Sequence, residues 1–213
     1  MNEAAAGKTL VREGYDVISE AYRADTFALG GSAYARAIEA VERRVPPGAR
    51  VLDLGCGCGV PVARRLAARY DVTGVDFSAR KVARARSLVP SATFVQADIT
   101  SVDLPRAAFD AVVSFLVIIH VPLEEQPALF DAVARWIMPG GTFCATVGQE
   151  AWTGTEDDWY SGPMYWSHGD RETYASWLTG RGFRIDQEWA VPEGDGGQAA
   201  LLATSLTRVG ERR

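Results

Sequence analysis

The residues best suited to bind a ligand form a glycine-rich turn after a short apolar segment. Residues 51–59 have the sequence Val-Leu-Asp-Leu-Gly-Cys-Gly-Cys-Gly, and Asp76 ends the next apolar segment. Glycines in such a turn let the backbone approach a ligand closely, and an acid at the end of the following strand suits a pair of ribose hydroxyls. The pattern therefore indicates a nucleoside-containing ligand, bound where two parallel strands end.

Asp53, which stands just before the glycines, distinguishes between nucleoside cofactors. Dinucleotide-binding turns aim a helix N-terminus at a pyrophosphate, and a carboxylate beside that group would repel it. The positions of Gly55, Gly57 and Gly59 also differ from the GxGxxG spacing of those turns. S-adenosylmethionine has no phosphate and carries a sulfonium and an ammonium group, so this cofactor is compatible with Asp53.

Apolar periodicity predicts the elements that position these residues. Strands are expected at residues 50–54, 71–75, 93–96, 110–115 and 142–147, with helices between them at 60–70, 79–88 and 122–136. Two helices precede them, at 10–22 and 32–44; a helix at 171–179 and strands at 183–191 and 198–207 follow, the last two joined by a glycine-rich turn at 193–197. This alternation predicts an α/β fold with a parallel sheet, helices on both faces and an antiparallel closing pair at one edge.

The turn Asp53-Leu54-Gly55-Cys56-Gly57-Cys58-Gly59 resembles the first motif of class I (Rossmann-like) S-adenosylmethionine-dependent methyltransferases, and the resemblance extends over residues 50–207. It implies a seven-stranded, mostly parallel sheet whose last strand is antiparallel. It also implies one domain of residues 1–213, with an N-terminal helical lid at 1–46 and a Rossmann-like core at 47–207. S-adenosylmethionine would be the cofactor and S-adenosylhomocysteine the product.

The same resemblance assigns residues to the cofactor. Asp76 would hold the ribose hydroxyls, with Phe77 beside the adenine. Asp98 would meet the adenine amine, and Ile99 would pack on the ring. Tyr15 and Tyr22, on the expected lid helix, would close on the amino-acid end of the cofactor or serve packing alone. The complete set of expected cofactor contacts is Tyr15, Tyr22, Asp53, Gly55, Cys56, Gly57, Asp76, Phe77, Asp98, Ile99 and Phe115.

The segment after the fourth expected strand contains the first candidate catalytic residue, His120. It lacks the Asn-Pro-Pro-Tyr motif of methylases that act on nucleobase amines or protein glutamines, which disfavours those substrates, and it resembles the small-molecule branch. Imidazole, with an ordinary pKa of about 6.5, suits a base that takes a proton from a hydroxyl or ammonium acceptor. The alternative is that His120 caps the following helix or orders the loop.

Residues 149–170 are predicted to form a long aromatic loop beyond the carboxyl end of the fifth strand. Long loops are usually functional, and aromatic walls with a few polar groups are typical of small-ligand pockets. The candidate acceptor contacts are Trp152, Trp159, Tyr160, Met164, Tyr165 and Trp166, with His168 as a second candidate catalytic residue. The alternative is a packed lid or a contact between subunits.

Composition limits the partners. The net charge is −5, from 27 acidic and 22 basic residues, so the chain lacks the positive surplus that nucleic-acid binding requires. No apolar stretch approaches the roughly 18 residues of a spanning helix, and no leader is recognisable, so we expect a cytoplasmic protein without a membrane partner. The three cysteines, Cys56, Cys58 and Cys144, fit apolar fillers better than a zinc site, and no metal is expected.

The predicted function is methyl transfer to a hydroxyl, with an amine or carbon less favoured, of a small aromatic or polycyclic natural-product metabolite. The protein would act as a monomer or homodimer. One alternative is a cyclase on the same fold that binds the cofactor without transferring methyl, and another is a sensor or scaffold that only binds it. An RNA- or protein-modifying enzyme is disfavoured by the acidic charge.

Overall fold

The structure, a computed structural model, describes residues 3–22, 26–27, 29–30, 32–160, 162–191 and 197–206. The predicted turn at 193–197, except for Gly197, and the end of the last predicted strand at residue 207 lie outside these residues. No helix within the described ranges is long and apolar enough to cross a membrane.

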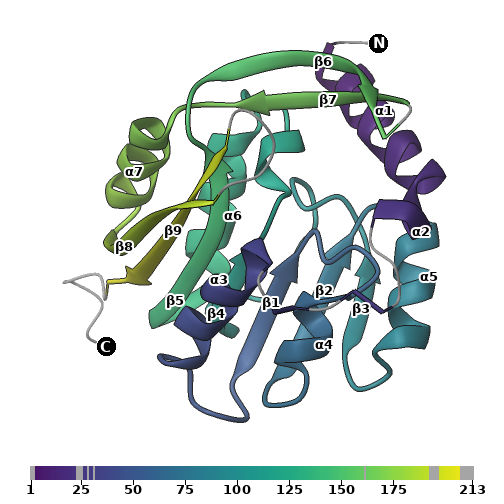
Figure 1. The fold of residues 1–213 in the computed structure, drawn as a ribbon. Coiled ribbons are helices and arrows are strands. Elements are labelled where there is room, and N and C mark those ends of the chain that lie inside the picture. The colour runs from purple at the N-terminus through teal and green to yellow at the C-terminus, as the bar shows by residue number, and fades with distance from the viewer. Residues whose placement is uncertain are drawn as a thin grey trace.

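A seven-stranded sheet organises the chain, with the order β3-β2-β1-β4-β5-β9-β8 (Figure 1). Its strands are β1 (Arg50–Leu54), β2 (Asp71–Asp76), β3 (Thr93–Gln96), β4 (Phe109–Ser114), β5 (Ile137–Gly148), β8 (Phe183–Val191) and β9 (Gln198–Ser205). Strands β1 to β5 are parallel, and β9 is antiparallel to both β5 and β8. The predicted fold class, including the antiparallel last strand, is confirmed.

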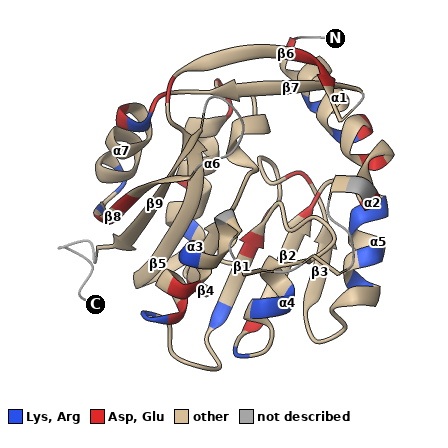
Figure 2. Ribbon diagram, in the orientation of Figure 1, with Lys and Arg blue, Asp and Glu red and all other residues tan. Residues whose placement is uncertain are grey.

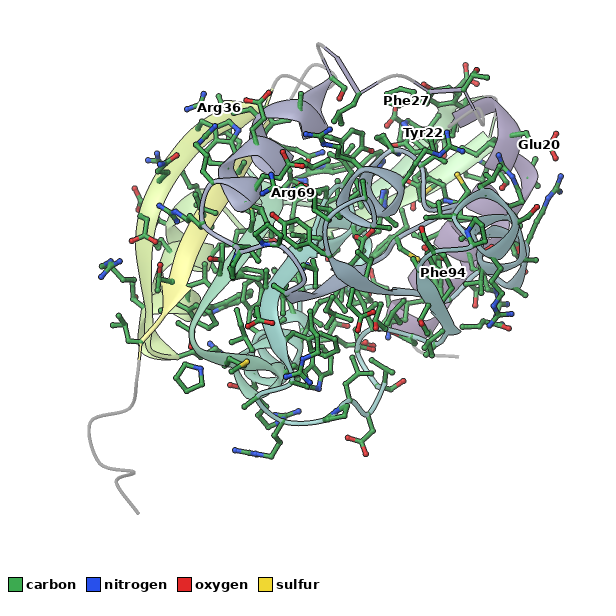
Figure 3. The ribbon with its side chains drawn as sticks, turned by 90° about the horizontal axis from the view of Figure 1, so that it is seen from below. Glu20, Tyr22, Phe27, Arg36, Arg69 and Phe94 are labelled. Atoms are coloured by element: carbon green, nitrogen blue, oxygen red, sulfur yellow. The ribbon has the colours of Figure 1, made fainter. Side chains whose placement is uncertain are left out.

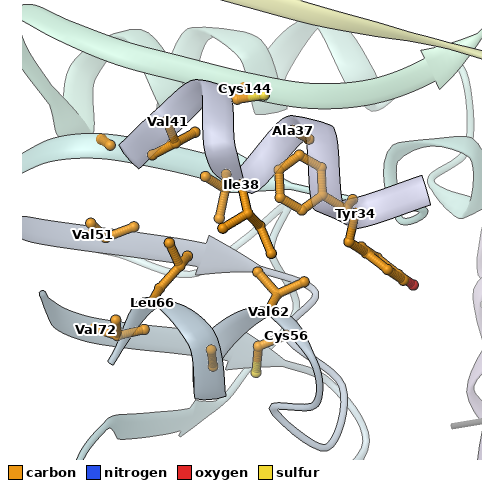
Figure 4. Close-up of a cluster of buried hydrophobic side chains, with 14 of the residues drawn as sticks. Tyr34, Ala37, Ile38, Val41, Val51, Cys56, Val62, Leu66, Val72 and Cys144 are labelled. Atoms are coloured by element: carbon orange, nitrogen blue, oxygen red, sulfur yellow. The ribbon is translucent and has the colours of Figure 1, made fainter. Parts of the chain in front are cut away.

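Helices cover both faces of this sheet because successive strand residues point to opposite sides. On one face lie α3 (Ala33–Glu42), α4 (Val62–Leu66) and α5 (Ala79–Leu88), and on the other lie α6 (Gln126–Trp136) and α7 (Arg171–Gly180). In β1, Val51 faces the first group and Leu52 the second, and both are fully buried. Figure 4 shows side chains of α3 and α4, among them Ile38 and Leu66, meeting over β1 and β2.

The N-terminal segment forms two helices, α1 (Glu3–Val17) and α2 (Ser19–Tyr22), where a single helix at 10–22 was predicted. Helix α1 buries Val11 and Tyr15, which are four residues apart and therefore share one face. Together with Ile18 they pack against Met164 and Tyr165, far along the chain. The segment thus lies beside the carboxyl ends of the central strands.

Residues 149–170 contain an antiparallel hairpin and not the predicted loop. Strands β6 (Trp152–Trp159) and β7 (Gly162–His168) form a separate two-stranded sheet, in which Trp152 pairs with His168 and Gly154 with Trp166. Threonine and aromatic residues favour strands, which explains the difference from a loop. Figure 1 shows the hairpin reaching across the molecule to α1.

Helix α6 begins at Gln126, later than the predicted start at Pro122, and a short 3-10 helix, η1 (Ile118–His120), precedes it. Gln126 is fully buried, and its Nε2 donates to the carbonyls of Ile118, Val121 and Ser167 at 2.7–3.0 Å. The Tyr174 hydroxyl donates to its Oε1 at 2.8 Å. This side chain joins η1, the hairpin and α7, and so fixes the segment that carries His120.

Candidate active site

An inner cavity lies between the carboxyl ends of the central strands and helix α1. Every residue assigned above to the cofactor lines it, namely Tyr15, Tyr22, Asp53, Gly55, Cys56, Gly57, Asp76, Phe77, Asp98, Ile99 and Phe115. Figure 2 shows acidic residues at the ends of β1 and β2, where the cavity begins. The structure therefore brings together residues from the whole N-terminal half of the chain.

The glycine turn gives the cavity its backbone wall. Gly55, Gly57 and Gly59 all have positive φ, at +71°, +56° and +78°, which other residues rarely adopt. A Cβ at Gly55 would overlap the side chain of Val117, whereas a Cβ at Gly57 would have only Lys81 Cδ nearby, at 4.0 Å. Gly57 therefore leaves open space beside the backbone, as close approach of a ligand requires.

Asp53 is buried, with 2% of its surface exposed, and its Oδ2 has no hydrogen-bond partner among the residues that the structure describes. Burial, with a smaller contribution from Asp76, raises the pKa of the Asp53 carboxyl to about 8. A buried carboxylate without a partner is unfavourable unless a cation or donor meets it. An ammonium group in the cavity would meet that need, so this residue fits S-adenosylmethionine.

Asp76 is held at the end of β2 by two backbone donors. Gly57 N–H donates to Oδ2 and Ser78 N–H to Oδ1, both at 2.9 Å. Burial raises the pKa of Asp76, while Lys81 acts in the opposite direction. The carboxylate is thus oriented before any ligand arrives, and each oxygen retains a lone pair for a hydroxyl.

Lys81 lines the inner cavity but was missed in the sequence. Its Nζ lies 3.6 Å from the centroid of the Tyr15 ring, a cation–π geometry, and burial lowers the pKa of the Lys81 ammonium. The available signal was its place in the first turn of α5, close after Asp76. Lys81 adds a positive charge to the cavity that also contains Asp53 and Asp76, and its contact with Tyr15 joins α5 to α1.

Polar contacts fasten α1 and α2 to the core at several points. Lys8 Nζ contacts Asp98 Oδ2 at 2.8 Å and Thr100 Oγ1 at 2.7 Å, and it also pairs with Glu125. Ser78 donates to the carboxylate of Asp16. Figure 3 shows Glu20 at the outer surface, where it pairs with Arg80 at 3.2 Å. The lid helices therefore close one side of the inner cavity.

His120 is buried at the mouth of the inner cavity, and both of its ring nitrogens have partners. Nδ1 lies 2.8 Å from the carbonyl of Tyr165, which can only accept, so Nδ1 carries the proton. The Tyr15 hydroxyl then donates to Nε2, at 2.9 Å. Burial lowers the pKa of His120 to about 4, so the ring is neutral near pH 7.

An outer cavity of about 540 Å³ adjoins the inner one, and Tyr15, Tyr22, Leu116 and His120 line both. Of the predicted acceptor contacts, four line the outer cavity (Trp152, Trp159, Tyr160 and Trp166), as does His168. The other two differ: Met164 and Tyr165 are buried against α1, outside the lining of either cavity.

Five further residues of the outer cavity were not anticipated: Leu116, Ile119, Glu156, Gly197 and Gln198. Leu116 has a φ of +60°, an unfavourable conformation for leucine, and its N–H donates to Thr146 Oγ1 at 2.6 Å. Nothing in the sequence around Leu116 signals this conformation. Within the described ranges, no group of three or more His, Cys, Asp or Glu residues is arranged to hold a metal ion.

The fold and the two joined cavities define a Rossmann-like α/β protein with an inner cavity that contains charged groups and an outer cavity lined mainly by rings. Comparison with known proteins agrees. Residues 51–141 match the family described as a methyltransferase domain.

Curated relatives match about half of this chain. Phosphoethanolamine N-methyltransferase 1 of Arabidopsis thaliana is 36% identical over 110 residues, covering 48% of this chain and 22% of that protein. An uncharacterized methyltransferase of Mycobacterium tuberculosis is 39% identical over 106 residues, covering 48% of this chain and 52% of that protein. The chain thus spans at most about half the length of these relatives.

Solved structures match nearly the whole chain at low identity. Magnesium protoporphyrin IX methyltransferase from Synechocystis, with bound S-adenosylmethionine, has a TM-score of 0.72 and 19% identity, covering 96% of this chain and 99% of that chain. The [4+2]-cyclase SpnF has a TM-score of 0.71 and 21% identity, covering 92% and 95%. Residues 51–141 thus match a methyltransferase domain, and the chain has the fold of class I (Rossmann-like) S-adenosylmethionine-dependent methyltransferases.

Proposed function

We propose that the chain binds S-adenosylmethionine in the inner cavity and transfers its methyl group to a hydroxyl of a small aromatic metabolite in the outer cavity. S-adenosylhomocysteine is the second product. The observation that carries the proposal is that the two cavities share Tyr15, Tyr22, Leu116 and His120. A ligand in one cavity would therefore meet a ligand in the other at these residues.

The inner cavity offers partners for the ribose hydroxyls and the ammonium group of the cofactor. Asp76 is oriented to accept from the ribose hydroxyls, and the unpartnered Oδ2 of Asp53 would accept from the ammonium group. The bound cofactor would supply an electrophilic methyl group on a good leaving group. The chain's main task is then to align the acceptor and exclude water, which supplies much of the rate in such reactions.

Tyr15 and His120 provide a route for the proton that the acceptor hydroxyl must lose. The Tyr15 hydroxyl can take that proton on its oxygen while passing its own hydrogen to His120 Nε2. A ring with a pKa of about 4 is a weak base, but a hydroxyl oxygen that is gaining a methyl group becomes a strong acid. A neutral, buried histidine therefore suffices, and Tyr15 and His120 act as a pair.

The lining of the outer cavity favours a flat acceptor without negative charge. It includes the rings of Trp152, Trp159, Tyr160 and Trp166, and its described residues include no lysine or arginine. The phosphate of a substrate such as phosphoethanolamine would find no cation there, although relatives of that specificity match this chain. We therefore favour an aromatic hydroxyl, with an amine or carbon acceptor as the less favoured variants.

A second candidate function is cyclisation without methyl transfer. The similarity to SpnF, described as a [4+2]-cyclase, favours it because that fold relationship covers most of both chains. In such an enzyme the outer cavity would fold a polyene while the inner ligand stayed intact. The two functions differ in the mass of the product.

The first experiment is incubation of the purified protein with methyl-labelled S-adenosylmethionine and a panel of phenols and hydroxylated polycyclic compounds. Label in a product heavier than its acceptor by one methylene would support transfer. Cofactor binding without labelled product, together with a cyclised product of unchanged mass, would instead support the cyclase. Failure to bind either S-adenosylmethionine or S-adenosylhomocysteine would exclude both.

A further inference from the structure

Two residues that line the outer cavity each carry a buried polar atom without a hydrogen-bond partner in the described part of the chain. Among the described residues, the buried side-chain nitrogen and oxygen atoms without a partner are Asp53 Oδ2, Trp166 Nε1 and Gln198 Oε1. The first belongs to the inner cavity, and the other two residues line the outer one. Buried polar atoms are nearly always paired in folded proteins, so such exceptions indicate sites that a ligand completes.

Gln198 is held rigidly at the start of β9. Its backbone pairs with Gly148 of β5 and Val191 of β8, and only 7% of its surface is exposed. Gly148 has no side chain, and a Cβ there would overlap the ring of His168, so His168 packs directly against the strand beside Gln198. Gln198 therefore lies in the wall of the outer cavity, where strands, and not a loop, hold its backbone.

Trp166 is fixed in the same cavity by strand β7 and by two neighbouring rings. Its ring lies 4.4 Å from that of His120, tilted by 34°, and 5.8 Å from that of Trp159, nearly perpendicular. These contacts use the faces and edges of the indole and leave Nε1 without a partner. Since His120 also lines the inner cavity, Trp166 is near the place where the two cavities meet.

The two atoms have opposite hydrogen-bonding roles. The indole Nε1 can only donate, and the amide Oε1 can only accept. A single ligand that satisfied both would carry an oxygen acceptor for Trp166 and an N–H or O–H donor for Gln198. Without lysine or arginine among the described residues of this lining, the ligand would not be anionic.

We infer that Gln198 and Trp166 form the polar recognition pair of the acceptor subsite, and that the acceptor is a neutral, planar ring compound with a carbonyl oxygen and an N–H or O–H donor. Ring lactams and hydroxylated cyclic ketones belong to this class. The inference rests on the proposed function, because it assigns the outer cavity to the methyl acceptor. It adds the hydrogen-bonding pattern that selects among flat rings.

The test is a binding titration measured by calorimetry in the presence of saturating S-adenosylhomocysteine. Three probes are used: carbostyril, a planar lactam with both groups; N-methylcarbostyril, which lacks the donor; and indole, a planar ring compound that keeps an N–H donor but lacks the carbonyl. Wild-type protein is expected to bind carbostyril about tenfold more tightly than either analogue, because each analogue leaves one buried group unpaired.

Variants separate hydrogen bonding from shape. Gln198→Met should weaken carbostyril about tenfold and leave N-methylcarbostyril unchanged, so the preference between them disappears. Trp166→Phe should weaken both carbonyl compounds and leave indole unchanged. Gln187→Met, an identical exchange at an exposed position of β8, is the matched control.

The outcomes are distinguishable. Equal binding of the three probes, or a preference for carbostyril that persists in Gln198→Met, would overturn the inference, as would failure of every probe to bind to protein that binds S-adenosylhomocysteine. Failure of S-adenosylhomocysteine itself to bind would instead contradict the proposed function. Unchanged affinity for S-adenosylhomocysteine and an unchanged melting temperature in each variant would show that the variants are folded.

Discussion

The inner and outer cavities share a boundary but are built by different means. The inner one is formed by the strand ends and turns of the core, with the charged groups of Asp53, Asp76 and Lys81 inside it. The outer one is formed mainly by rings on the hairpin and on α1 and α2, with few polar groups. Backbone and charge thus recognise one ligand, whereas ring surface recognises the other.

This difference predicts that substitutions in one cavity leave binding in the other largely intact. The seven-stranded sheet positions the inner cavity, whereas the two-stranded hairpin carries most of the rings of the outer one, to which β9 adds Gln198. Only the shared residues, Tyr15, Tyr22, Leu116 and His120, should affect both. The following substitutions examine that separation.

The largest effect is expected for Gly57→Arg. The new side chain enters open space in the inner cavity, so affinity for S-adenosylhomocysteine should fall by more than about 1,000-fold, or about 4 kcal/mol, by calorimetry. Gly48→Arg is the matched control, because Gly48 also has a positive φ, of +80°, but nothing lies within 4 Å of a Cβ there. Equal loss of binding in both variants would mean that backbone strain, and not occupation of the cavity, is responsible.

His120→Gln should lower kcat by about 100-fold, a typical contribution of a positioned proton acceptor. Tyr15→Phe should have an effect of similar size, since the two residues act in sequence on one proton. His168→Gln should cost much less, because His168 Nδ1 is bonded to the Glu150 carbonyl, at 2.7 Å, and the residue lines only the outer cavity. A larger loss of kcat in His168→Gln than in His120→Gln would mean that His168, and not His120, accepts the proton.

The pH dependence follows from the low pKa of His120. Because the folded protein keeps this ring neutral down to about pH 4, the wild-type rate should not decline through about pH 6.5, where an ordinary histidine titrates. The unfolded chain takes up the proton first, so this residue's contribution to stability is complete above about pH 6.5 and is lost as the pH falls towards 4. Rate profiles and urea unfolding of wild type and His120→Gln check both statements.

Trp159→Ala should act on the outer cavity alone. The ring packs against Tyr15 and Tyr22, at 5.3 and 5.1 Å, and its loss should lower kcat/KM for the acceptor by about 30-fold, or about 2 kcal/mol. Affinity for S-adenosylhomocysteine should change by less than about threefold. Trp159→Phe should restore most of the activity, and a large loss of cofactor affinity in Trp159→Ala would contradict the separation of the two cavities.

Of these substitutions, Asp53→Asn is expected to have the smallest main effect, about tenfold weaker affinity for S-adenosylhomocysteine. The ligand-free protein should become more stable, by about 1–3 kcal/mol at pH 8, because a costly buried charge is removed. The folded pKa of about 8 lies above the unfolded value, so wild-type stability should fall as the pH rises from about 4 to 8, and the variant should lack that slope. Urea unfolding across this range, with the exposed Asp157→Asn as control, provides the measurement.

The residues assigned to the cofactor could be grouped from the sequence because they follow strands that local apolar patterns indicate. Asp53 and Asp76 each end an apolar run, so the strand boundaries place them at one edge of the sheet. The burial of Lys81 could not be predicted, since it depends on Tyr15 of a distant helix. Features that depend on residues near in sequence could thus be predicted. The contacts that helices α1 and α2 make with the core could not.

The outer cavity was predicted only in outline. Its aromatic content was evident from the sequence. Which residues of β7 line the cavity, as Trp166 does, and which are buried against α1, as Met164 and Tyr165 are, depends on how β7 packs against α1. Tyr160, at the hairpin end, has a φ of +50° without being glycine, so its residue type did not indicate this turn conformation. Gln198 joins the cavity through pairing with β5 and β8, which no local pattern could indicate.

The hairpin also has an open edge, because β6 pairs with β7 alone in its two-stranded sheet. An unpaired strand edge is a template on which another copy of the chain can add a strand and begin to aggregate. In β6 that risk is countered by Glu156, Asp157 and Asp158, all exposed, and by an irregular register between Glu156 and Trp159. The acidic run is therefore explained by solubility. It keeps β6, whose first residue Trp152 is 47% exposed, from pairing with β6 of another copy of the chain.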